Sequence, residues 1–468
     1  MVARSRAWVA VVVALAGMAA GCGAASTAQA PSAARTPTRA DCSPSRSGPA
    51  YPLRVRGRHL VDARGRPFLI NGDSAWSLIA QLPDQDVDRY VDDRKRRGFN
   101  SVLVNLLEAR YASKAPADIY GNQPFLVRND FSSPNEAYFR HADSVIEKAA
   151  KRGLLVLLDP AYFGYSDDGW YDVIEDNGAR KLEEYGRYLG TRYSRCQNIM
   201  WVIGGDRTPR DTATGDALAR GIVATQPRAL LTAHADSEAP VDRIWGGYDW
   251  LDANTLFTYK DVWTRAVALY KRSARPFFLI ESAYENDGFN PQTPTRMRTQ
   301  AYQAILGGST GHVFGNNPIW HFDGPGCCSS VPFPTTWQRA LGLEGSQSMS
   351  VLGKVFSRYP WYAMTPDTKA TFVTSGLGRG LDRVAASVAN QGSLALAFVP
   401  SARTIRVSLK RLRRPATLTW VDPTNGVRRR VGSVASGRVT LRTPGGNAGS
   451  GGDWLLVAES SGLRRGHG

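Results

Sequence analysis

The chain has 468 residues, of which 43% are hydrophobic and 10% aromatic, so it can bury a sizeable core and is long enough for two domains. Its net charge is +17, but it contains no nucleic-acid recognition motif, and we expect no nucleic-acid partner. The six histidines and five cysteines show no metal-ligand spacing such as H-E-x-x-H, so neither a catalytic metal nor another cofactor is expected.

The N-terminus has the pattern of an export signal. Arg4 and Arg6 precede an apolar run at 7–20, which is shorter than the roughly 20 residues that a membrane span needs. Small residues come directly before Cys22, as in a bacterial lipobox. Residues 1–21 are therefore predicted to be a lipoprotein-type signal peptide, with Cys22 as the lipidated first residue. The alternative is an ordinary secretory signal cleaved near 28–30.

Export has consequences for location and for the cysteines. We expect a protein that is anchored by its lipid alone to the outer face of a bacterial cell membrane, or else secreted. Residues 22–50 are rich in Ala, Ser, Thr, Pro and Arg, which predicts a disordered tether. Cys42, Cys196, Cys327 and Cys328 would remain after processing, and the sequence does not decide among their three disulfide pairings.

Between residues 51 and 360, short apolar runs alternate with amphipathic stretches. Strands are predicted at 68–71, 101–105, 154–159, 199–204, 230–233, 256–259, 277–280 and 312–315. Helices are predicted at 84–97, 135–152, 177–193, 211–225, 262–272, 295–306 and 346–358. Eight apolar strands alternating with helices predict an α/β fold of the closed (β/α)8 type, the TIM barrel. An open doubly wound sheet is the alternative, although no G-x-G-x-x-G turn follows the first strand.

From 361 to 459 the pattern changes to short strands separated by turn residues. Seven strands are predicted, at 371–374, 384–388, 394–398, 405–408, 416–421, 438–441 and 454–458, which indicates a small all-β sandwich. Residues 460–468 are predicted to be a disordered tail. The segment 400–468 contains 13 Lys or Arg and 3 Asp or Glu, so an anionic cell-wall or matrix polymer is a candidate partner. The alternative is an ordinary solvated basic face.

Two predicted barrel strands run into an acid. The strand at 199–204 is followed by Gly205 and Asp206, and the strand at 277–280 is followed by Glu281. In a (β/α)8 barrel the C-terminal ends of the strands form the substrate site. Two carboxylates that face one cleft are the minimum equipment for hydrolysing a glycosidic bond, so Asp206 and Glu281 are the predicted catalytic pair. The alternative is that Asp206 caps a helix and Glu281 pairs with an arginine.

The other strand ends carry aromatic, amide and charged side chains. Aromatic rings stack on the faces of sugars, while amides and carboxylates bind sugar hydroxyls, so the set is typical of a carbohydrate pocket. The residues predicted to bind substrate are Asp73, Trp76, Asn105, Tyr162, His234, Tyr259, Tyr284, Asn317 and Trp320.

Four segments resemble those of the apiosidase-like glycoside hydrolases: NGDSAW at 71–76, WVIGGD at 201–206, FLIESAYE at 278–285 and GHVFGNNPIW at 311–320. These bacterial (β/α)8 enzymes are commonly followed by a β-sandwich labelled a collagen-binding domain, which WVDPTNG at 420–426 and the later Pro444-Gly445 and Asp453-Trp454 resemble.

The resemblance implies that Asp206 is the acid/base and Glu281 the nucleophile of a retaining reaction, with Glu285 and Glu108 in reserve. The broader retaining clan carries Asn-Glu where this chain has Gly205-Asp206.

We therefore expect an exo-acting glycosidase that releases a terminal sugar from polysaccharide side chains, with a pentofuranose such as apiose as a candidate. The alternative is a non-catalytic surface protein that binds a glycan or matrix polymer. An esterase or protease is not indicated, because no G-x-S-x-G elbow is present.

Overall fold

The computed structural model describes residues 38–43, 45, 48–166, 168–287, 292–325, 335–435, 437–449 and 451–460. The predicted signal peptide, Cys22, the tether up to residue 37, Cys327, Cys328 and the tail from residue 461 lie outside the described residues. Within the described part, no helix combines the length and the apolar character that crossing a bilayer requires.

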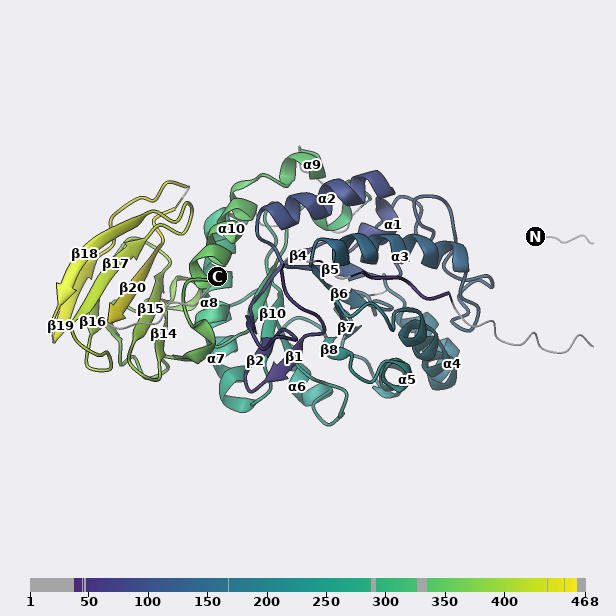
Figure 1. The fold of residues 1–468 in the computed structure, drawn as a ribbon, viewed down its shortest axis with the longest axis horizontal. Coiled ribbons are helices and arrows are strands. Elements are labelled where there is room, and N and C mark those ends of the chain that lie inside the picture. The colour runs from purple at the N-terminus through teal and green to yellow at the C-terminus, as the bar shows by residue number, and fades with distance from the viewer. Residues whose placement is uncertain are drawn as a thin grey trace, which may run out of the picture. The chain divides into compact units, whose positions relative to one another are not determined.

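Eight parallel strands form the barrel, which confirms the predicted (β/α)8 fold (Figure 1). They are β4 (Ile70–Ser74), β5 (Ser101–Asn105), β6 (Leu155–Asp159), β7 (Ile199–Gly204), β8 (Leu230–His234), β9 (Asn254–Phe257), β10 (Phe277–Glu281) and β11 (Gly311–Phe314). Their order in the sheet is β8-β7-β6-β5-β4-β11-β10-β9, so the sheet begins and ends with the consecutive strands β8 and β9.

Threonine hydroxyls join the two ends of this sheet. The Thr232 hydroxyl of β8 donates to the Ala253 carbonyl oxygen at 2.8 Å, and the Thr255 hydroxyl of β9 donates to the Ala233 carbonyl oxygen at 2.6 Å. Between β8 and β9 these side-chain hydrogen bonds take the place of the backbone hydrogen bonds that join the other neighbouring strands. They bring the sheet close to full closure.

The barrel strands are almost continuously apolar because both of their faces are buried. Along β5, for example, Leu103 lies in the cluster that fills the barrel, whereas Val102 and Val104 pack against the helices outside it. This alternation of side chains along each strand decides which residues point into the barrel.

Helices cover the outside of the barrel. They are α1 (Leu78–Gln81), α2 (Asp84–Arg96), α3 (Glu136–Lys151), α4 (Tyr171–Arg192), α5 (Ala213–Thr225), α6 (Val241–Ile244), α7 (Val262–Arg272), α8 (Pro294–Leu306), α9 (Trp337–Ala340) and α10 (Glu344–Phe356). The start of α3 shows why these segments are helical: the Asn135 side chain accepts a hydrogen bond from the Ala137 N–H, and two lysines lie in the last turn.

The segment before the barrel is not a free tether along its whole predicted length. The Ala40 N–H donates to the Arg192 carbonyl oxygen at 3.0 Å, and Cys42 forms a disulfide with Cys196, which lies between α4 and β7. Residues 38–43 therefore lie against the barrel, which corrects the tether prediction for these residues. They are followed by a small antiparallel sheet of β1 (Arg54–Arg56), β2 (His59–Val61) and β3 (Pro67–Phe68).

Two antiparallel sheets form the C-terminal domain, as predicted. The larger sheet contains β12 (Met364–Pro366), β14 (Ala385–Ala389), β15 (Leu394–Val399), β20 (Trp454–Ser460), β17 (Ala416–Val421) and β18 (Arg428–Val434). The smaller sheet contains β13 (Val373–Ser375), β16 (Thr404–Ser408) and β19 (Arg438–Arg442). Strands β12 and β18 were not predicted. The second is an exposed edge strand that begins with three arginines, so it shows no apolar alternation.

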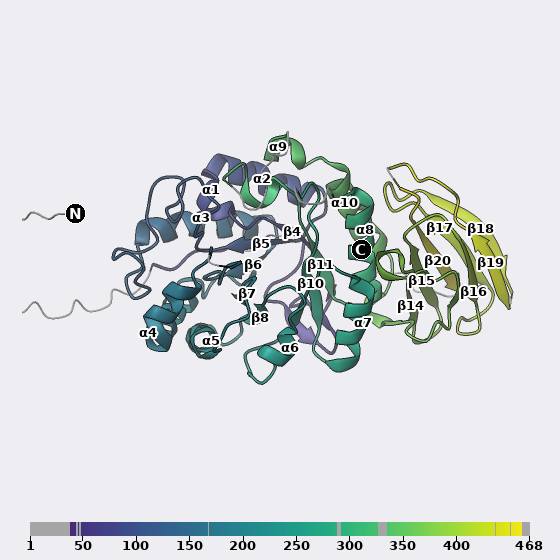
Figure 2. The same cartoon turned by 180° about the vertical axis from the view of Figure 1, so that it is seen from behind.

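The barrel and the C-terminal domain share one hydrophobic core. Helices α8 and α10 lie between the barrel strands and the larger sheet in both views (Figures 1 and 2). The Tyr302 ring of α8 stacks on the Phe398 ring of β15, with 4.6 Å between their centroids and 2° between their planes. Met297, Leu352 and Leu455 belong to the same buried cluster, so the interface is apolar and continuous.

Candidate active site

Asp206, His234 and Glu281 meet at the C-terminal end of the barrel. The Nε2 atom of His234 lies 3.1 Å from Oε2 of Glu281 and 3.5 Å from Oδ1 of Asp206. One carboxylate oxygen of Asp206, one carboxylate oxygen of Glu281 and one ring nitrogen of His234 all lie within 4.8 Å of one another. The predicted acid pair therefore shares one small site, with a histidine between the two carboxylates.

Two glycines deliver Asp206 to this site. Gly204 and Gly205 have φ values of 118° and 150°, which disfavour residues with a side chain. A Cβ atom on Gly204 would lie 2.2 Å from the His234 carbonyl oxygen, and one on Gly205 would lie 2.7 Å from the Tyr162 ring. The glycines thus allow the turn after β7 to pass close to β8 and to the Tyr162 ring.

The environment of Asp206 favours its protonated form. Burial raises the pKa of Asp206 well above its usual range, and the neighbouring Glu281 carboxylate raises it further. The His234 cation and the Tyr162 hydroxyl act in the opposite direction without cancelling this effect. Asp206 is therefore a carboxylic acid that can hold a proton at neutral pH.

The environment of His234 favours its protonated, positively charged form. Burial alone would lower its pKa, but the hydrogen bond to Glu281 and the charges of Asp206 and Glu281 outweigh burial and raise the pKa to about 9. The Nδ1 atom lies 3.1 Å from the Ala235 carbonyl oxygen, to which its N–H donates. A protonated ring can then also donate from Nε2 to Glu281.

A pocket of about 270 Å³ opens in front of the acid pair. It is lined by Trp76, Asn105, Tyr111, Tyr162, Tyr165, Asp206, Tyr259, Glu281, Tyr284, Asp287, Asn317 and Trp320. Nine of the eleven residues predicted for catalysis or substrate binding are in this lining, and the two others are Asp73 and His234. The aromatic rings and polar groups of the lining are chemically suited to a sugar.

Tyr284 organises one side of the pocket. Its hydroxyl accepts a hydrogen bond from the Trp76 indole N–H at 2.8 Å and lies 2.9 Å from the Ser74 hydroxyl oxygen. A Cβ atom on Gly315 would lie 2.6 Å from the Tyr284 ring, so β11 leaves room for that ring only because residue 315 is a glycine.

The structure corrects the predicted role of Asp73. The first barrel strand covers residues 70–74 rather than 68–71, so Asp73 lies within β4 and not beyond its end. Its side chain faces the helices, accepts a 2.7 Å hydrogen bond from the Tyr90 hydroxyl and lies 3.3 Å from the Arg94 guanidinium. Asp73 is fully buried there and does not contact the pocket.

His234 also takes a different place from the predicted one. It is fully buried beneath the pair and is not part of the pocket lining, so its contacts are with the two carboxylates rather than with a ligand.

The reserve acids Glu108 and Glu285 hold loops in place. Glu108 accepts hydrogen bonds from the Ser77 hydroxyl and from the backbone N–H groups of Arg110 and Tyr111. Glu285 accepts from the Gly345 N–H and the Asn316 side-chain amide, both at 2.8 Å. Neither carboxylate lines the pocket.

Sequence reasoning missed three residues of the lining: Tyr111, Tyr165 and Asp287. Each belongs to a loop that follows a barrel strand, and Tyr165 comes three residues after the predicted Tyr162. Their positions in the sequence could have indicated them, because in this fold the loops after the strands face the substrate as well as the strand ends.

Asp206, His234 and Glu281 also have the donor types of a metal site. The Nδ1–H group of His234 donates to a backbone carbonyl oxygen, as it does in many metal-ligating histidines. While the ring is protonated, however, Nε2 has no lone pair for a metal ion. A cation would therefore compete with the proton on His234, and the absence of a catalytic metal stays a prediction.

Comparisons with known proteins agree with this geometry. Residues 55–363 match the model of the apiosidase-like catalytic domain, and residues 366–459 match one described as "Putative collagen-binding domain of a collagenase". No curated protein sequence matches the chain.

Two solved structures share both parts of the fold. A glycoside hydrolase family 5 protein from Bacteroides vulgatus is 25% identical, with a TM-score of 0.78 over 87% of this chain and 94% of that chain. Another glycoside hydrolase is 24% identical, with a TM-score of 0.78 over 89% of this chain and 98% of that chain. A carboxylate pair at the mouth of such a barrel and a match over most of the chain lead to one conclusion: this protein is a glycoside hydrolase and belongs to the apiosidase-like family.

Proposed function

We propose that this glycoside hydrolase works with retention of configuration, with Asp206 as acid/base and Glu281 as nucleophile. The proposal rests on the short separation of the two acids, because a carboxylate oxygen of Asp206 lies within 4.8 Å of one of Glu281. Retaining enzymes hold their carboxyl groups about 5–5.5 Å apart, whereas inverting enzymes need roughly 6.5–9.5 Å to admit a water molecule between acid and sugar.

The two carboxyl groups then have different tasks. Protonated Asp206 gives its proton to the leaving oxygen while Glu281 attacks the anomeric carbon, which forms a covalent glycosyl-enzyme. Asp206 next takes a proton from water, and the resulting hydroxide breaks the sugar–Glu281 bond. His234 donates a hydrogen bond to Glu281 at 3.1 Å and so fixes the orientation of the nucleophile.

The size of the pocket supports an exo-acting enzyme. A volume of about 270 Å³ suits one sugar unit rather than several, and aromatic side chains such as Trp76, Tyr162 and Trp320 surround it. We therefore propose that a terminal sugar is released from polysaccharide side chains, with a pentofuranose such as apiose as the leading candidate.

Release assays on aryl glycosides and on plant or cell-wall polysaccharides test this proposal. Asp206→Asn and Glu281→Gln should each lose most of the activity and keep the fold, whereas Asp236→Asn, an exposed acid at the end of β8 outside the pocket, should stay active. NMR of the first-formed product should show the anomeric configuration of the substrate. Full turnover by either pair variant would refute the assignment, and sugar binding without any release would favour a binding protein.

We propose further that the protein is exported and lipid-anchored at Cys22. The Cys42–Cys196 disulfide supports export, because disulfides persist mainly in oxidising compartments. Mass spectrometry of the N-terminal peptide from membranes tests the anchor: a lipidated Cys22 is expected, and an N-terminus near 28–30 would instead indicate simple secretion.

An anionic polymer is the proposed partner of the basic C-terminal domain. Support comes from β18, on which Arg429 and Arg430 are exposed at a sheet edge. Retention of the protein on an anionic polysaccharide column should weaken as salt is added, and Arg429→Ser with Arg430→Ser should reduce it. Unchanged retention by this double variant would argue against the partner.

A further inference from the structure

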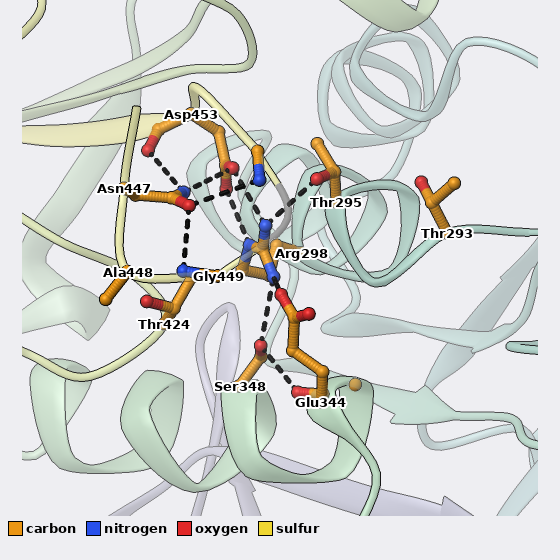
Figure 3. Close-up of polar contacts among 12 residues, drawn as sticks. Thr293, Thr295, Arg298, Glu344, Ser348, Thr424, Asn447, Ala448, Gly449 and Asp453 are labelled. Carbon is orange, nitrogen blue, oxygen red and sulfur yellow. Dashed lines mark hydrogen bonds and ion pairs between the residues drawn. The ribbon is translucent and has the colours of Figure 1, made fainter. Parts of the chain in front are cut away.

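We propose that the C-terminal domain helps to position the active site, and that Asp453 is a positioning residue for the loop that directly follows Glu281. This inference rests on the proposed role of Glu281 as the nucleophile. It starts from a polar node between the two domains, in which one arginine of the barrel is held by an aspartate of the C-terminal domain (Figure 3).

Arg298 of α8 is the centre of this node, and its side chain is completely buried. Its Nε and one terminal nitrogen donate to the two Asp453 oxygens at 2.7 and 2.9 Å, and the same terminal nitrogen donates to the Thr295 hydroxyl. The other terminal nitrogen donates to Glu344 at 2.9 Å and to the Ser348 hydroxyl at 3.2 Å. All five N–H groups of the guanidinium are thereby used.

The node fixes α8 and α10 with respect to each other, because Arg298 and Thr295 belong to α8 whereas Glu344 and Ser348 belong to α10. Asp453 joins the C-terminal domain to the same arginine, and Asn447 donates a 2.8 Å hydrogen bond to the Asp453 oxygen that also accepts from Arg298. A buried arginine in this position depends on its partner, because an uncompensated buried charge is costly.

The same two helices hold the loop after β10. The Gln300 side-chain amide of α8 donates to the Ala283 carbonyl oxygen at 2.8 Å. The Gly345 N–H at the start of α10 donates to Glu285 at 2.8 Å. The loop after β10 is therefore anchored two and four residues after Glu281, by the two helices that Arg298 joins to the C-terminal domain.

The contacts that connect Asp453 with the loop after β10 are closely packed. A Cβ atom on Gly345 would lie 2.6 Å from the Glu285 carboxylate, one on Gly449 would lie 2.3 Å from Glu344, and one on Gly451 would lie 2.4 Å from Asp453. Close-packed interiors transmit displacements rather than absorb them. A shift at Asp453 is thus expected to move the loop and with it both Glu281 and Tyr284.

Asp453→Asn tests the inference, because it removes the charge at nearly constant volume. Asp367→Asn is the matched control. Asp367 is also a buried aspartate of the C-terminal domain, but it accepts its hydrogen bonds from Thr371, Phe372 and Val373 of the same domain. Both variants of the full chain should unfold at a lower temperature, and kinetics should be measured well below both transitions.

Asp453→Asn is expected to change kcat much more than KM. In Asp453→Asn, kcat should fall about tenfold or more while KM changes less than about twofold, since misplacing a reacting group by a fraction of an ångström is costly. In Asp367→Asn, kcat should stay near the wild-type value. The indole N–H resonance of Trp76, which donates to Tyr284, should shift only in Asp453→Asn.

Equal kcat values in the two variants, with an unchanged Trp76 resonance, would overturn the inference. If Asp453→Asn does not fold, Glu344→Gln breaks the same node from the less buried side and should give the same kcat and resonance changes. Failure of the proposed function looks different: it would show as turnover by Glu281→Gln, whatever the Asp453 variant does.

Discussion

Replacing His234 with glutamine should move the pH–rate profile to higher pH. The His234 cation lies 3.5 Å from the Asp206 carboxylate oxygen and lowers the pKa of Asp206. Two unit charges at this distance interact by about 5 kcal/mol at an effective dielectric constant of about 20 and by about 1 kcal/mol at that of water. Loss of the cation removes this interaction and should thus raise the pKa of Asp206 further.

The sign of the kinetic effect follows from the proposed role of Asp206 as acid/base. Activity requires the protonated acid, so a higher pKa extends activity to more alkaline pH and shifts the descending limb of the profile upward. The maximal kcat should fall, because the hydrogen bond that orients Glu281 is lost.

The assay is kcat/KM between pH 4 and pH 10 for the wild type and His234→Gln, with His312→Gln as the control. His312 is equally buried, but burial lowers its pKa to about 3 and it contacts Asn71 rather than the acid pair. The control profile should keep the wild-type limbs. A His234→Gln profile that stays in place or moves to lower pH would refute the charge assigned to His234.

Three further predictions concern stability and pocket shape. Cys42→Ser should lower the free energy of unfolding by about 2–5 kcal/mol in urea titrations, and an unchanged midpoint would contradict a formed disulfide with Cys196. Asp73→Asn should cost about 3 kcal/mol, because it breaks a buried ion pair, and should leave KM unchanged; a raised KM with unchanged stability would restore Asp73 to the substrate site. Gly205→Ala should destabilise the fold by about 1–3 kcal/mol and reduce kcat, since the new methyl group collides with the Tyr162 ring; wild-type kinetics and stability would show that the turn after β7 is not constrained.

The barrel could be predicted from the sequence because its strands are buried on both faces, and so are continuously apolar, and because its helices begin and end at recognisable residues. The limit lies in the strand boundaries. The apolar run at Phe68, Leu69 and Ile70 places the first strand early, whereas the barrel strand begins at Ile70 and runs to Ser74. That shift changed the assignment of Asp73, since one residue along a strand reverses the face to which a side chain points.

That Asp206 and Glu281 lie close together was predictable from the strand ends, but the environment of the two carboxylates was not. The protonation of His234 depends on its distances to Asp206 and Glu281. The closed barrel sets these distances, and no local sequence pattern predicts them. The Arg298–Asp453 contact joins residues 155 positions apart in two domains, and a single arginine in a helical pattern is typical of a solvated face. The pairing of Cys42 with Cys196 needed the packing of residues 38–43 against α4.

The disulfide also changes what a protease can do to this enzyme. It closes the chain from residue 42 to residue 196 into a covalent ring that contains β1 to β6, α1 to α4 and the pocket residues Trp76, Asn105 and Tyr162. The most exposed apolar side chains of this ring are Leu126 and Val127, in a surface loop where a first cut is expected. A single cut there opens the ring without releasing a fragment, so both halves remain joined through Cys42 and Cys196. The nicked enzyme should therefore keep its pocket assembled and show its cleavage only after reduction.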